Sequence, residues 1–178
     1  MNDMRHKDQV NEKDSGFNER VVSVDRVARV VKGGRRFRFR ALVVIGDGKG
    51  QVGVGLGKGL DVTAAVAKAT DSAKKHLSKV VIVNGTLPHE SFAKAASAKV
   101  LIKPAAPGTG IIAGGVVRVV LEAAGYSNAL SKSLGSSNKV NMAYATVDAL
   151  RAVQPREKWV TTKKAVPKKT AKAAKETA

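Results

Sequence analysis

The sequence predicts an α+β fold made of two small α/β domains, and three observations carry this prediction. Residues 20–58 contain three strand-like runs separated by glycine turns, and a helical pattern follows in residues 61–77. A second round of strand and helix patterns then occupies residues 80–153. In a chain of 178 residues, an apolar fraction of 43% suffices for cores of this size.

The first two runs predict a β-hairpin. A β-branched run over residues 21–31 is separated by Gly33-Gly34 from a run in which cationic and aromatic residues alternate. Alternation at period two places consecutive residues on opposite faces of a strand. One face carries Arg36, Arg38 and Arg40, and the other carries Phe37, Phe39, Ala41, Val43 and Ile45. We expect the aromatic and aliphatic face to be buried and the arginine face to contact a polyanion.

The third run has glycine along one face. Val52, Val54 and Leu56 share a face, and Gly53, Gly55 and Gly57 lie opposite them. A strand face without side chains indicates that another backbone or a ligand comes close, here a packed helix or an RNA phosphate. Asp61 then has the position of an N-cap for a helix from residue 62 to about residue 77. The predicted apolar side of this helix holds Val62, Val66, Ala69, Ala73 and Leu77.

The second half of the chain predicts a smaller α/β unit. Residues 80–83 have the pattern of a strand before the turn Asn84-Gly85, and residues 99–103 predict the next strand. A loop over residues 104–110 leads to a helix from about residue 116 to residue 124, which Gly125 ends. Asn141 or a neighbouring polar residue begins a last helix.

The charge of the chain indicates a nucleic-acid partner. It has 32 Lys and Arg against 14 Asp and Glu, a formal net charge of +18. Two cationic zones, residues 20–58 and 154–178, bracket a nearly neutral body. The first zone lies on predicted strands and suits a fixed docking surface, whereas the second is a low-complexity arm.

The sequence lacks the residues that several classes of function require. There is no cysteine, and His6, His76 and His89 fall in no metal-ligand spacing, so we expect neither metal nor cofactor. No nucleophile, base and orienting group form a plausible set, so we expect no catalytic residue. The N-terminus lacks an apolar signal segment, and the longest apolar stretch, residues 111–121, is too short to span a membrane.

A glycine cluster formally matches a nucleotide-binding motif, but its context contradicts that interpretation. Residues 48–53 fit G-x-G-x-x-G, which binds a pyrophosphate at the start of a helix. Here the chain continues as a strand, and neither Lys49 nor Lys58 has the glycine spacing of a Walker A loop. We interpret the cluster as a turn in a binding module.

Several ordered motifs give the chain a resemblance to a known family. They are residues 31–35, 44–50, 52–58 and 84–86, and above all Gly108-Thr109-Gly110-Ile111-Ile112-Ala113-Gly114-Gly115. Over roughly residues 19–153 the chain resembles the fifth protein of the bacterial small ribosomal subunit. The resemblance implies a first domain like the double-stranded-RNA-binding fold, with three strands and a helix. It implies a second domain that is a two-layer sandwich with a left-handed βαβ topology.

The resemblance also implies a function and a domain organisation. It implies a cytoplasmic structural protein of the ribosome that binds the small-subunit (16S) ribosomal RNA near the central pseudoknot and the messenger RNA entry path. It also implies a contribution to subunit assembly and translational accuracy. Ribosomal proteins four and eight are the implied protein partners. We expect an extension at residues 1–18, domains at 19–79 and 80–154, and a basic disordered tail at 155–178. The alternative is a free-standing RNA chaperone or a histone-like condensing protein, which the lysine-alanine tail suggests.

Two sets of site residues follow from the residues and the resemblance together. The expected RNA-binding residues are Arg26, Arg29, Lys32, Gly33, Gly34, Arg35, Arg36, Arg38, Arg40, Lys49, Gly53, Gly55 and Lys58. By resemblance, the expected interface with a neighbouring protein comprises Thr109, Gly110, Gly114, Gly115 and Arg118. Arginine suits the first set because its planar guanidinium can chelate a phosphate and stack on a base.

Overall fold

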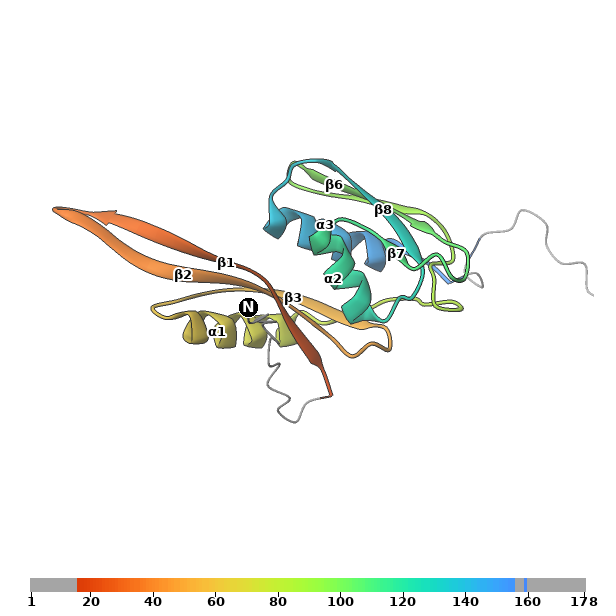
Figure 1. The fold of residues 1–178 in the computed structure, drawn as a ribbon, viewed down its shortest axis with the longest axis horizontal. Coiled ribbons are helices and arrows are strands. Elements are labelled where there is room, and N and C mark those ends of the chain that lie inside the picture. The colour runs from red at the N-terminus through yellow and green to blue at the C-terminus, as the bar shows by residue number, and fades with distance from the viewer. Residues whose placement is uncertain (1–15, 156–158, 160–178) are drawn as a thin grey trace, which may run out of the picture.

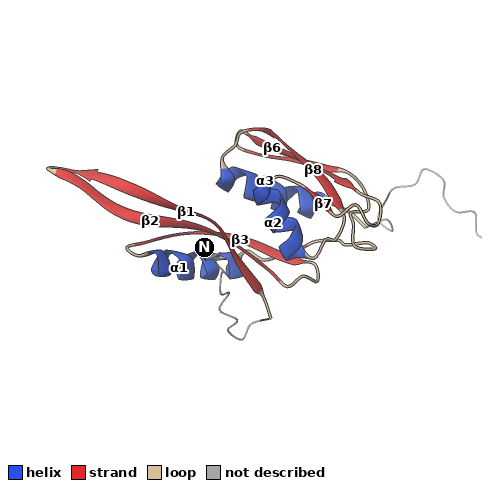
Figure 2. Ribbon diagram, viewed as in Figure 1, coloured by secondary structure: helices blue, strands red, loops and turns tan. Residues whose placement is uncertain are grey.

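The computed structural model describes residues 16–155 and 159, which form two four-stranded sheets and three helices (Figures 1 and 2). The first sheet and its helix comprise β1 (Asn18–Val31), β2 (Gly34–Gly46), β3 (Gln51–Gly59), α1 (Val62–Lys75) and β4 (Ser78–Lys79). The second sheet and its helices comprise β5 (Ser91–Ala95), β6 (Ala98–Pro104), β7 (Ile111–Ile112), α2 (Gly115–Ala124), β8 (Ala129–Gly135) and α3 (Lys139–Ala152). This confirms the predicted fold class. Most of the expected terminal segments, residues 1–15, 156–158 and 160–178, lie outside the described residues.

The first sheet is antiparallel, in the order β1-β2-β3-β4. The predicted hairpin is confirmed, because β1 and β2 pair from Asn18↔Gly46 to Val31↔Gly34 around a two-residue connection. A register irregularity between Val21 and Ser23 interrupts the pairing once. The sequence predicted three strands, and the short β4 adds a fourth by pairing with the start of β3.

Helix α1 covers one face of this sheet and lies directly on the glycine stripe of β3. An ideal Cβ on Gly55 would lie 2.0 Å from the carbonyl oxygen of Ala69, and one on Gly57 would lie 2.3 Å from that of Ala65. Of the two alternatives that the stripe left open, the packed helix is therefore the correct one. Close approach also requires small residues on the helix, and its buried residues are Ala65, Ala69, Thr70 and Ala73. Val62 was predicted to lie on the apolar side of this helix, and this prediction was wrong, because Val62 is exposed.

The opposite face of the first sheet packs against the second half of the chain. Leu42, Val44, Val52 and Val54 belong to one apolar cluster with residues of α2, α3 and β6. The molecule therefore has four layers, which are α1, the first sheet, the pair α2 and α3, and the second sheet (Figure 1). The central part of β2 is buried on both faces, because residues 41–45 alternate between the two apolar clusters.

The second sheet has the order β5-β6-β8-β7. Strands β7 and β8 are parallel and are joined through α2, so they form a βαβ unit. The left-handedness that the resemblance implies for this unit stays a prediction. Gly125 ends α2 in a left-handed conformation at φ +98°, as predicted. Helix α3 begins earlier than Asn141, because the side chain of Asn138 accepts a hydrogen bond from the Val140 amide at 3.0 Å.

Four strand assignments in this half differ from the prediction, and one of them is the two-residue strand β7, which was not predicted. Residues 80–83 form no strand of either sheet. The Val80 amide donates to the Gly50 carbonyl at 2.8 Å, and Val83 makes an isolated bridge with Thr86. Strands β5 and β8 were missed because their inward positions are mostly Ser and Ala, which give a weak apolar alternation.

No helix in the described part of the chain is long and apolar enough to cross a membrane.

Candidate nucleic-acid interface

The hairpin of β1 and β2 extends beyond the rest of the molecule as a two-stranded ribbon (Figure 1). Strand β3 pairs with β2 only from Phe39 to Gly46, so residues 27–38 have no neighbour in the sheet other than each other. Most side chains on this ribbon are exposed, and Val30 near the tip is 77% exposed. A ribbon that buries so little apolar surface adds little to a core and is available to a partner.

One face of the ribbon carries a row of cations. Arg36, Arg38 and Arg40 alternate along one face of β2, and the sheet register places Arg29 opposite Arg36 and Lys58 opposite Arg40. The row comprises Arg29, Arg36, Arg38, Arg40 and Lys58. Like charges directly opposite each other on a sheet are destabilising, so this row works against the free protein and suits a polyanionic partner.

One carboxylate partly neutralises the base of this row. Arg40 donates from two guanidinium nitrogens to Asp25 Oδ2, at 2.8 Å and 3.3 Å. Among the residues that the structure describes, Arg29, Arg36 and Arg38 have no carboxylate within 4.0 Å. The outer three arginines therefore keep their guanidinium groups for an external acceptor, whereas Arg40 is held on the sheet.

The other face of the ribbon combines Arg26, Arg35 and Phe37. The Arg26 guanidinium lies over the Phe37 ring at 3.8 Å from its centroid, within range of a cation–π interaction. The prediction that Phe37 is buried was wrong, because this side chain is 47% exposed. Helix α1 begins at Val62, near the end of β3, so its cover extends as far as Phe39 and not to Phe37.

The tip of the ribbon is the connection Lys32-Gly33. Gly33 has φ +83°, a conformation that favours glycine, and an ideal Cβ on Gly34 would meet nothing within 4 Å. The structure thus gathers most of the expected RNA-binding residues on one ribbon: Arg26, Arg29, Lys32, Gly33, Gly34, Arg35, Arg36 and Arg38. Arg40 and Lys58 lie at its base, and Lys49 lies at the far end of β2 in the turn to β3.

Two of the expected RNA-binding residues were wrong. Gly53 and Gly55 are buried beneath α1, and an ideal Cβ on Gly53 would lie 2.5 Å from the Ala73 carbonyl oxygen. Their missing side chains admit the helix, so no RNA backbone can reach them while α1 is in place. The glycine stripe signalled a close approach correctly, but it could not distinguish a helix from a ligand.

The turn that matched a nucleotide motif has a structural role. The amides of Gly48 and Gly50 donate to the carbonyls of Ala123 and Ala124, at 3.1 Å and 3.0 Å. Asp47 Oδ1 holds the turn by accepting from the amides of Lys49 and Gln51. The turn therefore caps the C-terminal end of α2 and joins the two halves of the molecule, which explains its glycines without a phosphate.

The loop expected to meet a neighbouring protein is exposed and held in one shape. Asn128 Oδ1 accepts from the amides of Gly108 and Gly110, at 3.1 Å and 3.0 Å, and this contact was not foreseen from the sequence. Within the loop and the first turn of α2, Thr109, Gly114, Gly115 and Arg118 are exposed, and Gly110 is half-buried. Ideal Cβ atoms on Gly114 and Gly115 would meet nothing within 4 Å, so a partner could approach the backbone there.

The described residues contain little that suggests other chemistry. No group of three or more His, Asp or Glu side chains in residues 16–155 could hold a metal ion. Burial raises the pKa of the Tyr126 phenol, and its hydroxyl donates to the Val81 carbonyl at 2.8 Å. This tyrosine lies away from the ribbon and stabilises the link between the two halves.

Comparisons with known proteins agree with this geometry. A family model for ribosomal protein S5, N-terminal domain, matches residues 17–81, and one for ribosomal protein S5, C-terminal domain, matches residues 93–162. Among curated proteins, small ribosomal subunit protein uS5 of Salinibacter ruber is 51% identical over 152 residues, covering 84% of this chain and 87% of that protein. The chain therefore belongs to the ribosomal protein uS5 family.

Proposed function

We propose that this protein is a structural component of the small ribosomal subunit and that it binds the ribosomal RNA through the β1–β2 ribbon. The proposal rests on Arg29, Arg36 and Arg38, which have no carboxylate partner among the described residues and lie outside the core on a ribbon of fixed register. Arginine can chelate phosphate and stack on exposed bases, and a rigid ribbon fits the shape of folded RNA. No catalytic role is assigned to any residue.

The family membership supports a more detailed assignment. We place the ribbon near the central pseudoknot and the messenger RNA entry path of the cytoplasmic ribosome, where the protein would contribute to translational accuracy. The exposed loop with Thr109 and Gly110, together with Arg118 on α2, would contact ribosomal protein four. Ribosomal protein eight would contact the second domain.

Binding to RNA at increasing salt concentration tests the role of the ribbon. A triple variant, Arg29→Ala, Arg36→Ala and Arg38→Ala, is compared with the wild type on a small-subunit ribosomal RNA transcript. Each lost phosphate contact lowers the slope of log affinity against log salt by about 0.7–0.9, so the slope of the triple variant should fall by about two. Affinity at moderate salt should fall by roughly tenfold or more.

A variant with the same change in charge provides the control. Lys68, Lys75 and Lys79 are exposed on α1 and β4, away from the ribbon, and their replacement by Ala should leave the salt slope almost unchanged. Equal slopes for the two triple variants would contradict the proposal. A chain without residues 156–178 tests the alternative, since a condensing protein that works through its tail would lose most of its affinity for any duplex.

A further inference from the structure

The outer face of the second sheet is the feature that the proposed function leaves unexplained. Helices α2 and α3 cover the inner face, where Val100, Ile102 and Ala129 are buried. Most side chains on the opposite face are exposed, among them Phe92, Lys99 and Ile112. The register places nine side chains on this outer sheet face: Phe92, Lys94, Lys99, Leu101, Lys103, Ile112, Leu130, Lys132 and Leu134.

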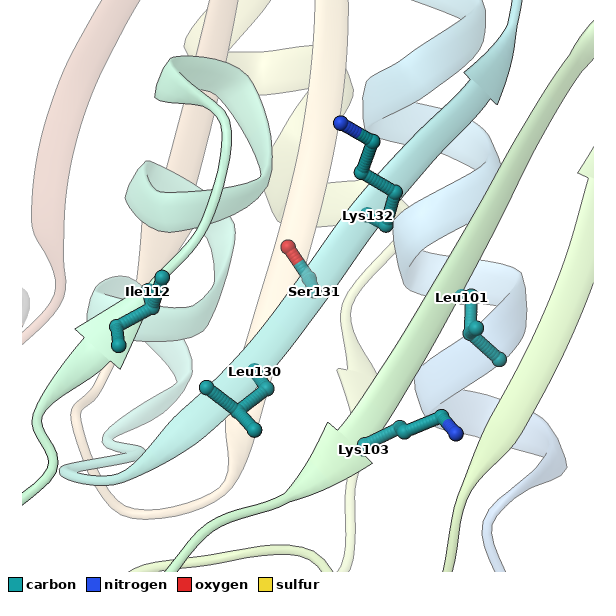
Figure 3. Close-up of a pocket in the computed structure, with 6 residues that line it drawn as sticks. All are labelled: Leu101, Lys103, Ile112, Leu130, Ser131 and Lys132. Carbon is teal, nitrogen blue, oxygen red and sulfur yellow. The ribbon is translucent and has the colours of Figure 1, made fainter.

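The outer sheet face is unusually apolar for an exposed surface. Phe92 and Ile112 are 54% and 56% exposed, and Leu130 and Leu134 are also exposed. A hollow of about 180 Å³ opens among side chains of β6, β7 and β8 (Figure 3). It is lined by Leu101, Lys103, Ile112, Leu130, Ser131 and Lys132. Exposed aliphatic side chains around a hollow are typical of a surface that receives a partner's side chain.

The charges on the outer sheet face all have one sign. Its four ionisable residues are Lys94, Lys99, Lys103 and Lys132, and Lys94 lies directly opposite Lys99 in the register. Such a pair destabilises the free sheet unless an anion lies between the two ammonium groups. At the edge of the face, Lys103 already pairs with the Glu90 carboxylate at 3.3 Å, so a carboxylate fits among these lysines.

The kind of cation distinguishes this surface from the ribbon. The ribbon uses arginines with a stacked phenylalanine, whereas the outer sheet face uses lysines among three leucines and one isoleucine, with its single aromatic residue, Phe92, on the edge strand β5. Leucine and isoleucine cannot stack on bases, and covering them with a hydrated sugar-phosphate chain would not bury them from water. A hollow lined by apolar side chains, with lysines between them, suits a protein partner that offers both apolar and acidic side chains.

The basic tail of the chain is a poor occupant of this surface. Residues 160–178 contain six lysines against one glutamate, so they carry the same charge as the outer sheet face. A suitable occupant has apolar side chains for the hollow and carboxylates for the lysine positions. We infer that the outer sheet face is a docking site for an acidic, amphipathic segment of another protein, whose apolar side chain fills the hollow between β6, β7 and β8.

Photo-crosslinking within assembled small subunits tests this inference. The inference rests on the proposed function in one respect, because the partner is sought in the small subunit. Leu130 is replaced by p-benzoylphenylalanine, the tagged full chain is produced in cells, and small subunits are isolated and irradiated. The expected product is one protein peptide with apolar residues flanked by Asp or Glu. Crosslinks to RNA, to residues 1–15 or 156–178 of this chain, or to no macromolecule would overturn the inference.

A charge exchange shows whether the lysines recognise the partner. The double variant Lys103→Glu and Lys132→Glu should lower the crosslink yield at least about tenfold, since like charges would then face each other. Replacing the acidic residues of the crosslinked peptide by Lys should restore the yield. The control Lys68→Glu with Lys75→Glu makes the same charge change on α1 and should leave the yield unchanged.

Incorporation into small subunits is measured in the same preparations. Failure of the crosslinkable chain to enter subunits would contradict the proposed function. If the charge-reversed chain enters subunits and its crosslink yield stays at the wild-type level, the docking inference is wrong. Far-UV circular dichroism and thermal unfolding of each variant confirm that a lost crosslink does not come from a lost fold.

Discussion

Gly55 has no side chain, and the helix that crosses it can therefore lie directly on the strand. The carbonyl oxygen of Ala69 occupies the place where a Cβ would stand, at 2.0 Å from its ideal position. Similar contacts occur at Gly53 and Gly57, so a row of single residues sets the distance between β3 and α1. At the scale of the residue, what looked like a ligand-binding stripe determines the packing of the first domain.

The substitution Gly55→Ala should lower the free energy of unfolding by about 2–3 kcal/mol, because α1 must move away from β3 to admit the methyl group. Urea denaturation followed by circular dichroism measures this change. Gly34→Ala is the matched control, since an ideal Cβ there meets nothing within 4 Å and the residue has no positive φ. An equal loss in both variants would contradict this explanation of the glycine stripe.

Tyr126 links the two halves through a buried hydrogen bond to the Val81 carbonyl. Tyr126→Phe should cost about 1–2 kcal/mol, because the carbonyl loses its partner. Burial raises the pKa of the Tyr126 phenol, so the folded chain holds it neutral where the unfolded chain would ionise it. Its contribution to stability is complete below the ordinary tyrosine pKa of about 10 and is lost as the pH rises above that value.

Urea denaturation between about pH 9 and 11 separates this contribution from other groups. The unfolding free energy of the wild type should decline more steeply over that range than that of Tyr126→Phe, since the variant lacks the buried phenol. Parallel declines in the two proteins would show that Tyr126 ionises as readily in the folded chain as in the unfolded one.

At the scale of the element, the ribbon and the core make different contributions. Residues 41–45 of β2 are buried on both faces, whereas residues 34–38 of the same strand are exposed. The outer half of the hairpin is held by its partner strand and by the Arg26–Phe37 contact, and it covers no apolar cluster. Its sequence is therefore free to serve binding while the inner half serves folding.

Shortening the hairpin tests this division. Deleting residues 27–31 and 34–38 joins Arg26 to Phe39, which are already cross-strand partners, through the native Lys32-Gly33 connection. The shortened chain should fold, with an unfolding free energy within about 1 kcal/mol of the wild type, because few apolar contacts are removed. Circular dichroism and urea denaturation measure this, and a full-length chain with Arg29, Arg35, Arg36 and Arg38 replaced by Gln controls for charge. An unfolded product would contradict the division.

The elements also show which parts of the fold the sequence could predict. The hairpin, α1 and the end of α2 at Gly125 follow from strong local patterns, namely alternation, helical periodicity and a glycine stop. Strands β5 and β8 have Ala and Ser at most of their inward positions. Tertiary packing buries these positions, and a local sequence pattern does not reveal such packing. The alternation of residue types predicted correctly which residues share each face of β2. The exposure of Phe37, however, depends on where α1 begins.

At the scale of the whole molecule, two different surfaces lie on opposite parts of a layered body. The arginine ribbon extends beyond the first sheet, and the outer sheet face lies on the far side of the second sheet from the helices (Figure 1). The apolar cluster shared by β2, β3, α2 and α3 fixes these surfaces relative to each other. The sequence indicated the ribbon through its charge, but the second surface depends on a sheet whose strands were only partly predicted.

The central claim is that the ribbon anchors the protein to the small subunit, and sedimentation of tagged protein from cell lysate tests it most directly. The wild type is compared with a chain in which Arg29, Lys32, Arg35 and Arg36 are replaced by Ala. We predict that the wild type migrates with small subunits and that the variant largely stays at the top of the gradient. Equal co-migration of both chains would contradict the ribbon as the main anchor, and two chains that both stay at the top would contradict the ribosomal function itself.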